Sequence, residues 1–555
     1  MTSTAAAPPP PSDDALSALP DLAPDLAEAL AAAGFGSAGL AALLGGDGLA
    51  ALDRGEPEAV AALLDDSALA RLVSAIVVGD PAPVRDVLGA DVHDRAVACG
   101  VLVPAEAGSG EGGGDVVAHD ADRGPSVAAA IDIRPLRLGG RDHLVFSDRD
   151  ASMRAHVPGP DHVPGVGRAS RSLLDITPSD PVGSVLDLGC GGGVQALGQI
   201  GADSVTATDL HPRALLFARA TLAAAGRPDA EILEGSWFEP VAGRRFDRIV
   251  ANPPFVVGPP DVGHVYRDSG LDLDGATATM IAGAVKHLAP GGTAHMLGAW
   301  VVGDDGDWRS RVASWIPDEG VEAWIVQRDV ADPAEYVGTW LRDESVDPRT
   351  PDGRMRTRRW LDHFAAAGVR GVGFGYITLQ RVDGPSSVLC EEMPQPLAGP
   401  FALEAEEYLA RTAWLRDKGA DDIAGSVFLI RPGVALERVS LPDPSGIGFA
   451  PEIVRVTRTD GPRWSHEIDE DVAGLLAAFQ EGASLRLLVD LRVDLGGWGG
   501  GDDDPEALKK SILSAAVPVV VDLVRHGLVL PEELVAGADA AAAEPGFAED
   551  GEAVR

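Results

Sequence analysis

The chain has 555 residues, enough for two or three domains, and its 45% hydrophobic and 23% charged residues can form ordinary globular cores. Three cysteines lie far apart without a CxxC pair, which argues against a zinc or other metal site and favours a reducing cytoplasm, and no apolar run reaches membrane-spanning length. The formal net charge of −40 would repel a long phosphate backbone, so only a local basic patch would allow nucleic acid to bind. The charge can also reflect genome composition or a saline habitat and carry no information about function.

The N-terminal region is expected to be helical. Residues 1–12 are rich in alanine and proline and lack the basic and apolar regions of a signal peptide, so we expect them to be disordered. Residues 13–107 form the expected helical domain, because apolar residues recur at helical spacing in stretches such as 22–33 and 67–77. A glycine-rich stretch at 108–115 then predicts a flexible joint.

Residues 126–385 show the strand and helix alternation of a mostly parallel α/β sheet. Two strands, 128–138 and 143–147, come first around a Gly139-Gly140 turn, and Pro135 places the first of them at an edge. The last strand, 369–380, has the alternation of an antiparallel edge strand. The strands expected between them are 185–188, 204–208, 231–233, 248–251, 293–297 and 322–326.

Residues 386–535 are expected to form a mixed α/β accessory domain. Strand-like pieces at 426–430 and 453–457 precede a predicted helix at 505–525. The acidic loop 496–504 and the tail 536–555 have the composition of disordered segments.

A glycine-rich turn follows the first core strand, in the sequence Val185-Leu-Asp-Leu-Gly-Cys-Gly-Gly-Gly193. Glycines at a strand end let a ligand approach the backbone, because no Cβ intervenes. The dinucleotide pattern G-x-G-x-x-G fails, since Val194 replaces its last glycine, and Asp187 would repel a pyrophosphate. A cationic amino-acid ligand would tolerate that carboxylate. The alternative is a turn needed only for packing.

An acidic residue, Asp209, ends the next strand. A carboxylate at that place can accept hydrogen bonds from both hydroxyls of a ribose. Asp209 can equally be the N-cap of a helix that begins near Pro212, and both roles can hold together.

The tetrapeptide Asn252-Pro-Pro-Phe255 directly follows the strand 248–251, at the edge of the sheet where open α/β sheets bind ligands. The Asn252 side-chain oxygen and the Pro253 carbonyl are two fixed acceptors that can hold both hydrogens of an amino group. Phe255 offers a face on which a flat amide or base can stack. The alternative is a Pro-Pro strand terminator with an incidental asparagine.

In this order the motifs resemble those of class I S-adenosylmethionine-dependent methyltransferases. They are most similar to the branch with an Asn-Pro-Pro-aromatic tetrad, which includes release-factor glutamine, small-domain ribosomal RNA and adenine-N6 methyltransferases. The resemblance is clear over residues 184–300 and looser over 128–382. It implies that 126–385 is a Rossmann-like, seven-stranded methyltransferase sheet, mostly parallel with an antiparallel last strand. It also implies a substrate-docking role for the N-terminal helices, whose deletion before Ser126 should spare cofactor affinity.

The resemblance also implies the site. Where the family often carries an aspartate for the adenine amino group, this chain has Ser236, a weaker acceptor. The segment 163–170 stands where relatives cover the cofactor, so it is either a lid or an ordinary surface loop. Catalysis is assigned to Asn252, Pro253, Pro254 and Phe255, and binding of S-adenosylmethionine to Asp187, Gly189, Cys190, Gly191, Gly193, Asp209, Ser236, Trp237 and Asn252.

The expected activity is methylation of a planar nitrogen, on a protein glutamine of a release factor or on an RNA or DNA base. The acidic surface favours the protein acceptor, whereas four arginines beside Trp360, at 354–359, are either a phosphate grip or a solvated helix face. Three alternatives fit the sequence less well. A nicotinamide dehydrogenase gives no reason for the tetrad, a calcium protein lacks EF-hand spacing after Asp504, and a non-catalytic binding module would not need both motifs.

Overall fold

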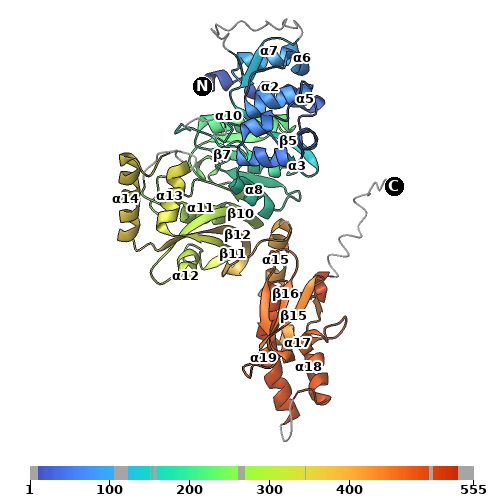
Figure 1. Cartoon of the computed structure of the whole chain (residues 1–555). Helices are drawn as coiled ribbons and strands as arrows, with labels where there is room; N and C mark the ends of the chain where they lie inside the picture. The colour runs from blue at the N-terminus through green and yellow to red at the C-terminus, as the bar shows by residue number, and fades with distance from the viewer. Residues whose placement is uncertain are drawn as a thin grey trace, which may run out of the picture. The chain divides into compact units, whose positions relative to one another are not determined.

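The computed structural model describes residues 10–105, 123–149, 152–153, 159–260, 269–343, 346–399, 401–498 and 504–535. The chain divides into two compact units, residues 1–393 and 394–555 (Figure 1). Disorder was expected at 1–12 and 536–555; residues 1–9 and 536–555, the joint at 108–115 and residues 499–503 of the acidic loop lie outside the described part. The expectation is wrong for residues 10–12, since Ser12 is the N-cap of the first helix.

An eight-stranded sheet is the centre of the first unit, with strand order β13-β11-β12-β10-β9-β6-β7-β8. The four pairings from β10 through β9, β6 and β7 to β8 are parallel, and β12 is antiparallel to both of its neighbours, which confirms the predicted fold class. The strands are β6 (Ser184–Leu188), β7 (Ser204–Asp209), β8 (Glu231–Glu234), β9 (Phe246–Ala251), β10 (Leu288–Val302), β11 (Glu319–Ala331), β12 (Gly371–Pro385) and β13 (Ser387–Glu392).

The expectation that the last core strand lies at an edge is wrong. β12 lies between β10 and β11, and β13 adds an eighth strand parallel to β11. Glycines make the interior position possible, since a Cβ on Gly373 would lie 2.4 Å from Trp300 Nε1 and one on Gly375 would lie 1.8 Å from the Val326 carbonyl oxygen. The alternation in the sequence is the same for an edge strand and an interior strand, so it did not distinguish them.

Helices cover both faces of this sheet, because successive strand residues point to opposite sides. Val185 and Val205 pack against α9 (Val194–Gly198) and α10 (Pro212–Ala224), whereas Leu186 and Ile249 pack against α11 (Gly275–His287). The remaining helices of this region are α8 (Arg168–Ile176), α12 (Trp308–Ala313), α13 (Pro333–Asp343) and α14 (Pro351–Ala366).

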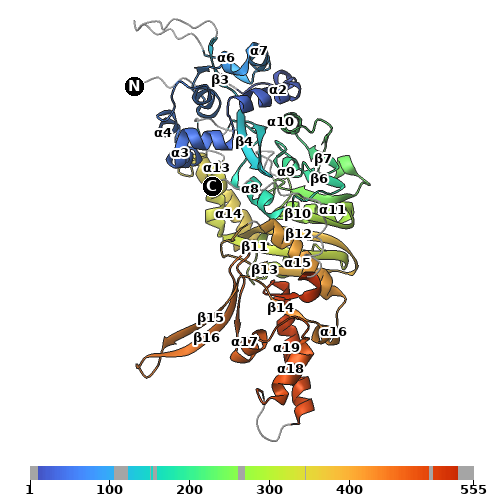
Figure 2. The ribbon, with the colours of Figure 1, turned by 90° about the vertical axis from the view of Figure 1, so that its right-hand side faces the viewer.

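The N-terminal helices share a hydrophobic core with α10. Leu22 and Leu26 of α2 belong to the same buried cluster as Phe217 of α10, and Figure 2 shows the two helices side by side. Among the described residues no single helix has the length and apolar composition of a membrane span, although α2 and α3, bent by 55°, pass that test together. The helices are α1 (Asp13–Leu16), α2 (Leu19–Ala32), α3 (Ser37–Arg54), α4 (Pro57–Ala61), α5 (Ala68–Leu72), the π-helix Val73–Val78, α6 (Arg85–Leu88) and α7 (Ala90–Ala98).

Two small sheets complete this part of the chain. The predicted strand 128–138 is divided between them, because β3 (Ser126–Ala129) pairs with β1 (Ala82–Pro83) and β2 (Leu102–Pro104), and β4 (Asp132–Leu138) forms a hairpin with β5 (Arg141–Ser147). Directly after β5, buried Asp148 pairs with Arg213 of α10 at 2.5 Å, and Arg213 also reaches Asp13 at 2.8 Å. This buried arginine therefore fixes α10 to the N-terminal region.

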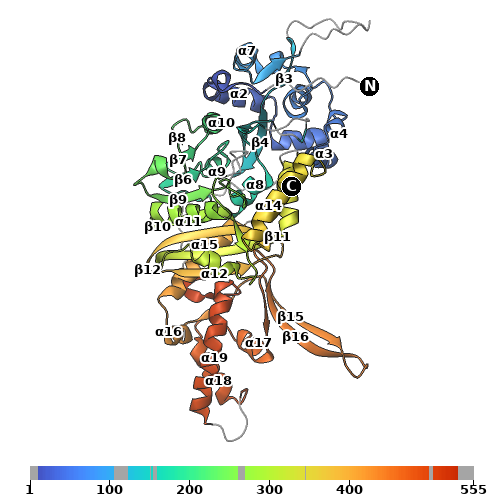
Figure 3. The ribbon, with the colours of Figure 1, turned by 90° about the vertical axis from the view of Figure 1, so that its left-hand side faces the viewer.

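The second unit is mixed α/β, with a three-stranded antiparallel sheet in which β15 and β16 form a long hairpin (Figure 3) and β17 pairs with β16. The predicted helix 505–525 is confirmed as α19. The other elements are α15 (Phe401–Arg416), α16 (Ala420–Gly425), β14 (Phe428–Ile430), β15 (Val434–Pro442), β16 (Phe449–Arg458), β17 (Ser465–Ile468), α17 (Glu470–Leu476), α18 (Leu485–Asp494), α19 (Pro505–Arg525) and β18 (Val529–Pro531).

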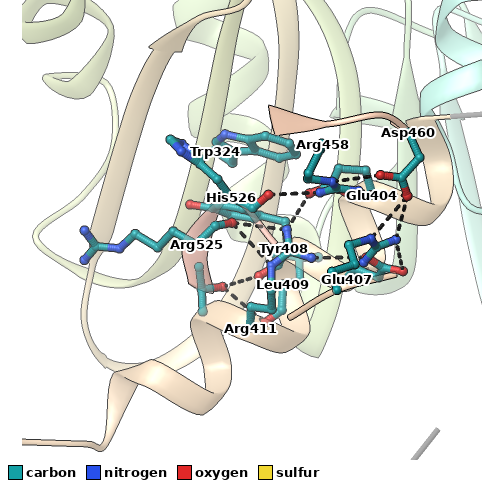
Figure 4. Close-up of polar contacts among 12 residues, drawn as sticks. Trp324, Glu404, Glu407, Tyr408, Leu409, Arg411, Arg458, Asp460, Arg525 and His526 are labelled. Carbon is teal, nitrogen blue, oxygen red and sulfur yellow. Dashed lines mark hydrogen bonds and ion pairs between the residues drawn. The ribbon is translucent and has the colours of Figure 1, made fainter. Parts of the chain in front are cut away.

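A buried ionic network holds this unit together (Figure 4). The Glu404 carboxylate of α15 pairs with Arg411 and, at 2.6 Å, with Arg458 of β16, and these three side chains are only 1–2% exposed. Arg411 and Arg458 also donate to the carbonyls of Arg525 and His526, at 3.1 and 3.0 Å. The network therefore joins α15 and β16 to the end of α19.

Candidate active site

A pocket lies at the carboxyl ends of β9, β6 and β7, which are adjacent in the sheet. Loops that follow adjacent parallel strands meet at the same edge, so motifs distant in the sequence come together there. Of the predicted site residues, the pocket is lined by Gly189, Cys190, Gly191, Asp209, Ser236, Trp237, Asn252, Pro253 and Pro254. Asp187, Gly193 and Phe255 do not line it.

The glycine turn holds a backbone that other residues rarely adopt, with φ of 69° at Gly189 and 51° at Gly191. The N–H groups of Gly189 and Cys190 both donate to the Thr208 carbonyl at 2.9 Å, which fixes the turn to β7. A Cβ on Gly191 would meet no atom within 4 Å, so the space beside this residue is open. The turn therefore leaves a bare stretch of backbone facing the pocket.

Gly193 has a different place in the structure. It is the N-cap of α9 with φ of 80°, and a Cβ on it would lie 3.2 Å from Ala218 Cα in α10. Gly192 lines the pocket instead, and a Cβ there would lie 2.8 Å from the Phe146 carbonyl oxygen. Gly193 is therefore needed for close packing between α9 and α10, which agrees at this one residue with the alternative of a turn needed only for packing.

Asp187 lies wholly buried at the end of β6. One carboxylate oxygen accepts from the Ala196 N–H at 2.8 Å, and the other has no hydrogen-bond partner among the described residues. Burial, together with the nearby charge of Asp209, raises the pKa of Asp187 to about 7. An unpaired buried oxygen of this kind is stabilised by a cationic or donor group that enters beside it.

Asp209 turns both carboxylate oxygens toward backbone N–H groups, those of Gly191 and His211, each at 2.9 Å. Burial raises its pKa, although these hydrogen bonds act in the opposite direction. The N-cap of α10 is His211, whose Nδ1 accepts from the Arg213 N–H at 3.3 Å, so the N-cap alternative for Asp209 is wrong. A carboxylate has about four lone-pair positions, so Asp209 can still accept from ligand hydroxyls.

The tetrad enters the pocket through its first three residues. Asn252 is half-buried, and its side chain makes no hydrogen bond with any described residue, so its amide oxygen is available to a ligand. Phe255 packs instead in a hydrophobic cluster with Leu273 and Trp360. The Val257 N–H donates to the Tyr336 hydroxyl at 2.7 Å, which fixes the chain just beyond the tetrad.

The turn after β8 forms another wall. The Gly235 N–H donates to the Asp209 carbonyl at 3.0 Å, and a Cβ on Gly235 would lie 2.5 Å from Pro240. Trp237 has φ of 48°, a left-handed conformation that is rare for a bulky residue. Backbone strain of this kind is retained where surrounding structure holds a binding wall in place. The two residues predicted here, Ser236 and Trp237, therefore reach the pocket together.

The pocket also has residues that sequence reasoning did not assign: Asp161, His162, Gln195, Leu210, His211, Ala214 and Ser269. His211 and Leu210 directly follow Asp209, which was the available signal for them. Val163, Pro164, Gly165 and Ser170 of the predicted lid segment also line the pocket. The Val163 N–H donates to Asp148 at 2.9 Å and Gln195 donates to the Ser170 carbonyl at 2.9 Å, so both ends of the segment are held. Over the residues described, no group of three His, Cys, Asp or Glu side chains is arranged to hold a metal ion.

Comparison with known protein families places this pocket in a recognised domain. Residues 164–299 match the family model described as methyltransferase small domain. Residues 32–112 and 406–531 match two families described as domains of unknown function, DUF7059 and DUF7782. The first match covers β6 to β9, most of β10, the glycine turn, Asp209 and the tetrad.

Similar proteins are known in several bacteria. The ribosomal RNA small subunit methyltransferase C of Salmonella paratyphi B is 36% identical over 139 residues, which are 24% of this chain and 37% of that protein. The protein of the same name from Salmonella choleraesuis is 37% identical with the same coverage. A solved structure, the T. thermophilus 16S rRNA N2 guanine methyltransferase with AdoMet and guanosine, is 23% identical and covers 31% of this chain and 47% of that chain, with a TM-score of 0.23. The chain thus spans little more than a third of the curated relatives that it matches.

Proposed function

Because residues 164–299 are a methyltransferase small domain of the class I, S-adenosylmethionine-dependent type, we propose that the whole chain methylates the exocyclic amino group of a base in RNA. The observation that carries this proposal is that the glycine turn and the first three tetrad residues line one pocket. A donor held at the turn would thereby face an acceptor held at Asn252. A nicotinamide dehydrogenase gives no reason for that arrangement.

The residues of the pocket fit S-adenosylmethionine. The unpaired oxygen of Asp187 lies behind the turn, where the cationic amino-acid end of the cofactor would be stabilised. Open space at Gly191 lets the ligand lie against the backbone, and Asp209 can accept from the ribose hydroxyls. Ser236 and Trp237 border the remaining part of the pocket, where the adenine would lie.

The bound cofactor supplies a methyl group already activated on a sulfonium, so the protein's main contribution is positioning. The Asn252 side-chain oxygen and the Pro253 carbonyl would each accept one hydrogen of the target amino group. These two hydrogen bonds direct the nitrogen lone pair and stabilise the positive charge that develops on nitrogen. Asn252 has no useful basicity, so the proton leaves to solvent after transfer.

RNA is preferred over a protein glutamine because the similar proteins named above are ribosomal RNA methyltransferases. To reach Asn252 the target base must be unpaired or flipped out of its helix. The test is transfer of a tritiated methyl group, with the full chain, to ribosomal RNA and to release factors from cells that lack the gene. Label on RNA alone is expected, and label on release factors alone would refute the RNA acceptor.

The role of Asn252 has its own test. Asn252→Ala should retain cofactor binding in calorimetry and lose at least about a hundredfold in turnover, as for loss of one transition-state hydrogen-bond partner. Ser170→Ala, which lines the same pocket, is the matched control and should lose little turnover. Unimpaired transfer by Asn252→Ala would exclude the assigned role.

A further inference from the structure

α14 is a basic surface on an acidic protein. The helix carries four exposed arginines, at 354, 356, 358 and 359, and two aspartates, at 352 and 362, whereas the whole chain has a net charge of −40. Figure 1 shows α14 beside α13 at the outer edge of its unit. An anionic polymer that approaches this protein is therefore attracted to α14 and repelled by most other surfaces.

Two of the arginines are available for a ligand. Arg356 pairs with Asp352 at 3.0 Å, but Arg354 and Arg358 form no ion pair with any residue that the structure describes. These two residues are four apart on a helix, so their side chains emerge on the same face. Both border a surface depression that Met355, 64% exposed, also lines.

The helix packs directly on the chain that follows the tetrad. A Cβ on Gly258 would lie 2.9 Å from the Trp360 ring, so the ring rests against Gly258, six residues after Asn252. His363 of α14 contacts Asp272 at 2.8 Å, and the Leu273 N–H donates to the Gly258 carbonyl at 2.9 Å. The basic helix is thus held against the loop that presents Asn252 to its acceptor.

We propose that α14 is the docking surface for the RNA acceptor, with Arg354 and Arg358 binding backbone phosphates next to the target base. This inference rests on the proposed function and names the surface by which the substrate is held. A guanidinium binds phosphate with paired hydrogen bonds, which suits a contact that positions the strand without reading its sequence. The arginines lie on a helix that Trp360 and His363 hold against the tetrad loop, a placement that the solvated-face interpretation does not use.

The experiment compares the full chain with Arg354→Ala/Arg358→Ala. A control variant, Arg141→Ala/Arg486→Ala, removes two exposed arginines elsewhere and lowers the net charge equally. Binding of a fluorescein-labelled single-stranded RNA is measured by anisotropy across salt concentrations, without cofactor, so that the result does not depend on methyl transfer. Calorimetry with S-adenosylmethionine reports whether the cofactor site is intact.

For Arg354→Ala/Arg358→Ala we expect RNA affinity at low salt to fall about tenfold, and the slope of log K against log salt to decrease by about 1.4, the value for two lost phosphate contacts on a single strand. Arg354→Lys/Arg358→Lys should keep most of the slope, and the control should match the wild type. Cofactor affinity should be unchanged in all variants.

An unchanged salt slope in the alanine variant, or wild-type protein that binds no RNA, would overturn this inference. If Arg354→Ala/Arg358→Ala binds RNA like the wild type but loses transfer to release factors in the tritiated-methyl assay, α14 docks a protein instead. If the wild type binds RNA through α14 but methylates none, the proposed function fails while the docking surface stands.

Discussion

The buried carboxyl of Asp187 makes cofactor binding dependent on pH. Its pKa of about 7 in the ligand-free protein means that the group is largely neutral at pH 6, whereas a cationic ligand prefers the carboxylate. Between pH 7.5 and 6.0 the charged fraction falls about eightfold, so affinity for S-adenosylmethionine should fall about eightfold. Binding below pH 7 should also release a proton, because a cationic ligand bound in front of the turn lowers the pKa of the carboxyl buried behind it.

The raised pKa of Asp187 also makes the free energy of unfolding depend on pH. A carboxyl whose pKa is raised on folding destabilises the ligand-free protein above that pKa, and the cost disappears as pH falls toward the unfolded value of 3.8. The rise of the pKa from 3.8 to about 7 lowers the free energy of unfolding of the ligand-free protein by about 4 kcal/mol above pH 7. Stabilisation by the cofactor should therefore be larger at pH 7.5 than at pH 6.0.

Calorimetry at both pH values, in two buffers of different ionisation enthalpy, measures the affinity and the proton release together. Asp187→Asn is the matched variant, since it keeps the side-chain shape and the acceptor for the Ala196 N–H. It should bind more weakly at pH 7.5 and lose most of the pH dependence. Asp209 also has a raised pKa, so identical pH profiles for wild type and Asp187→Asn would assign the effect to Asp209 and refute the reasoning.

Three further predictions follow from packing. An alanine is strained at both Gly191 and Gly193, because φ is positive at each, but only at Gly193 does α10 also lie close. Gly193→Ala should therefore lower the free energy of unfolding in urea denaturation by at least about 2 kcal/mol and by more than Gly191→Ala, which should fold and lose cofactor affinity; equal stability of the two variants would contradict this. Glu404→Ala leaves buried arginines unpaired and should destabilise the second unit by about 3–5 kcal/mol without changing cofactor affinity, and an unchanged denaturation curve would contradict it. Deletion of all residues before Ser126 should uncover Phe217 and yield aggregated protein on gel filtration, and a soluble monomer with wild-type cofactor affinity would support an independent N-terminal domain instead.

That last prediction reverses what the sequence suggested. The helical pattern of the N-terminal region predicts a separate docking domain, but the pattern gives only the apolar face of each helix and not its partner. In the structure Leu22 and Leu26 use that face to cover α10. The docking role itself remains a prediction, and point substitutions on the N-terminal surface are better suited to test it than deletion.

The sequence by itself determined the pocket's main walls. Gly189, Asp209 and Asn252 each end or follow a strand, and adjacent parallel strands bring their ends together, so local patterns were enough to predict that these residues meet. Ser236 and Trp237 were assigned from the resemblance to the methyltransferase family, and their place directly after β8 agrees with the same rule. That rule could not separate Gly192 from Gly193, since both are glycines in one turn and only the position of α10 decides which faces the pocket.

Contacts between segments distant in the chain were decided by the tertiary structure alone. The interior position of β12 depends on the packing of Trp300 over Gly373. The hydrophobic core shared by the N-terminal helices and α10 depends on α2, which covers α10. The position of α14 depends on the contact of Trp360 with Gly258. Periodicity in a sequence indicates which side of a helix or strand is apolar, and motif spacing indicates which residues end a strand. Neither specifies which remote surface is buried against that side, because the partner is selected by complementary shape and burial over the whole fold.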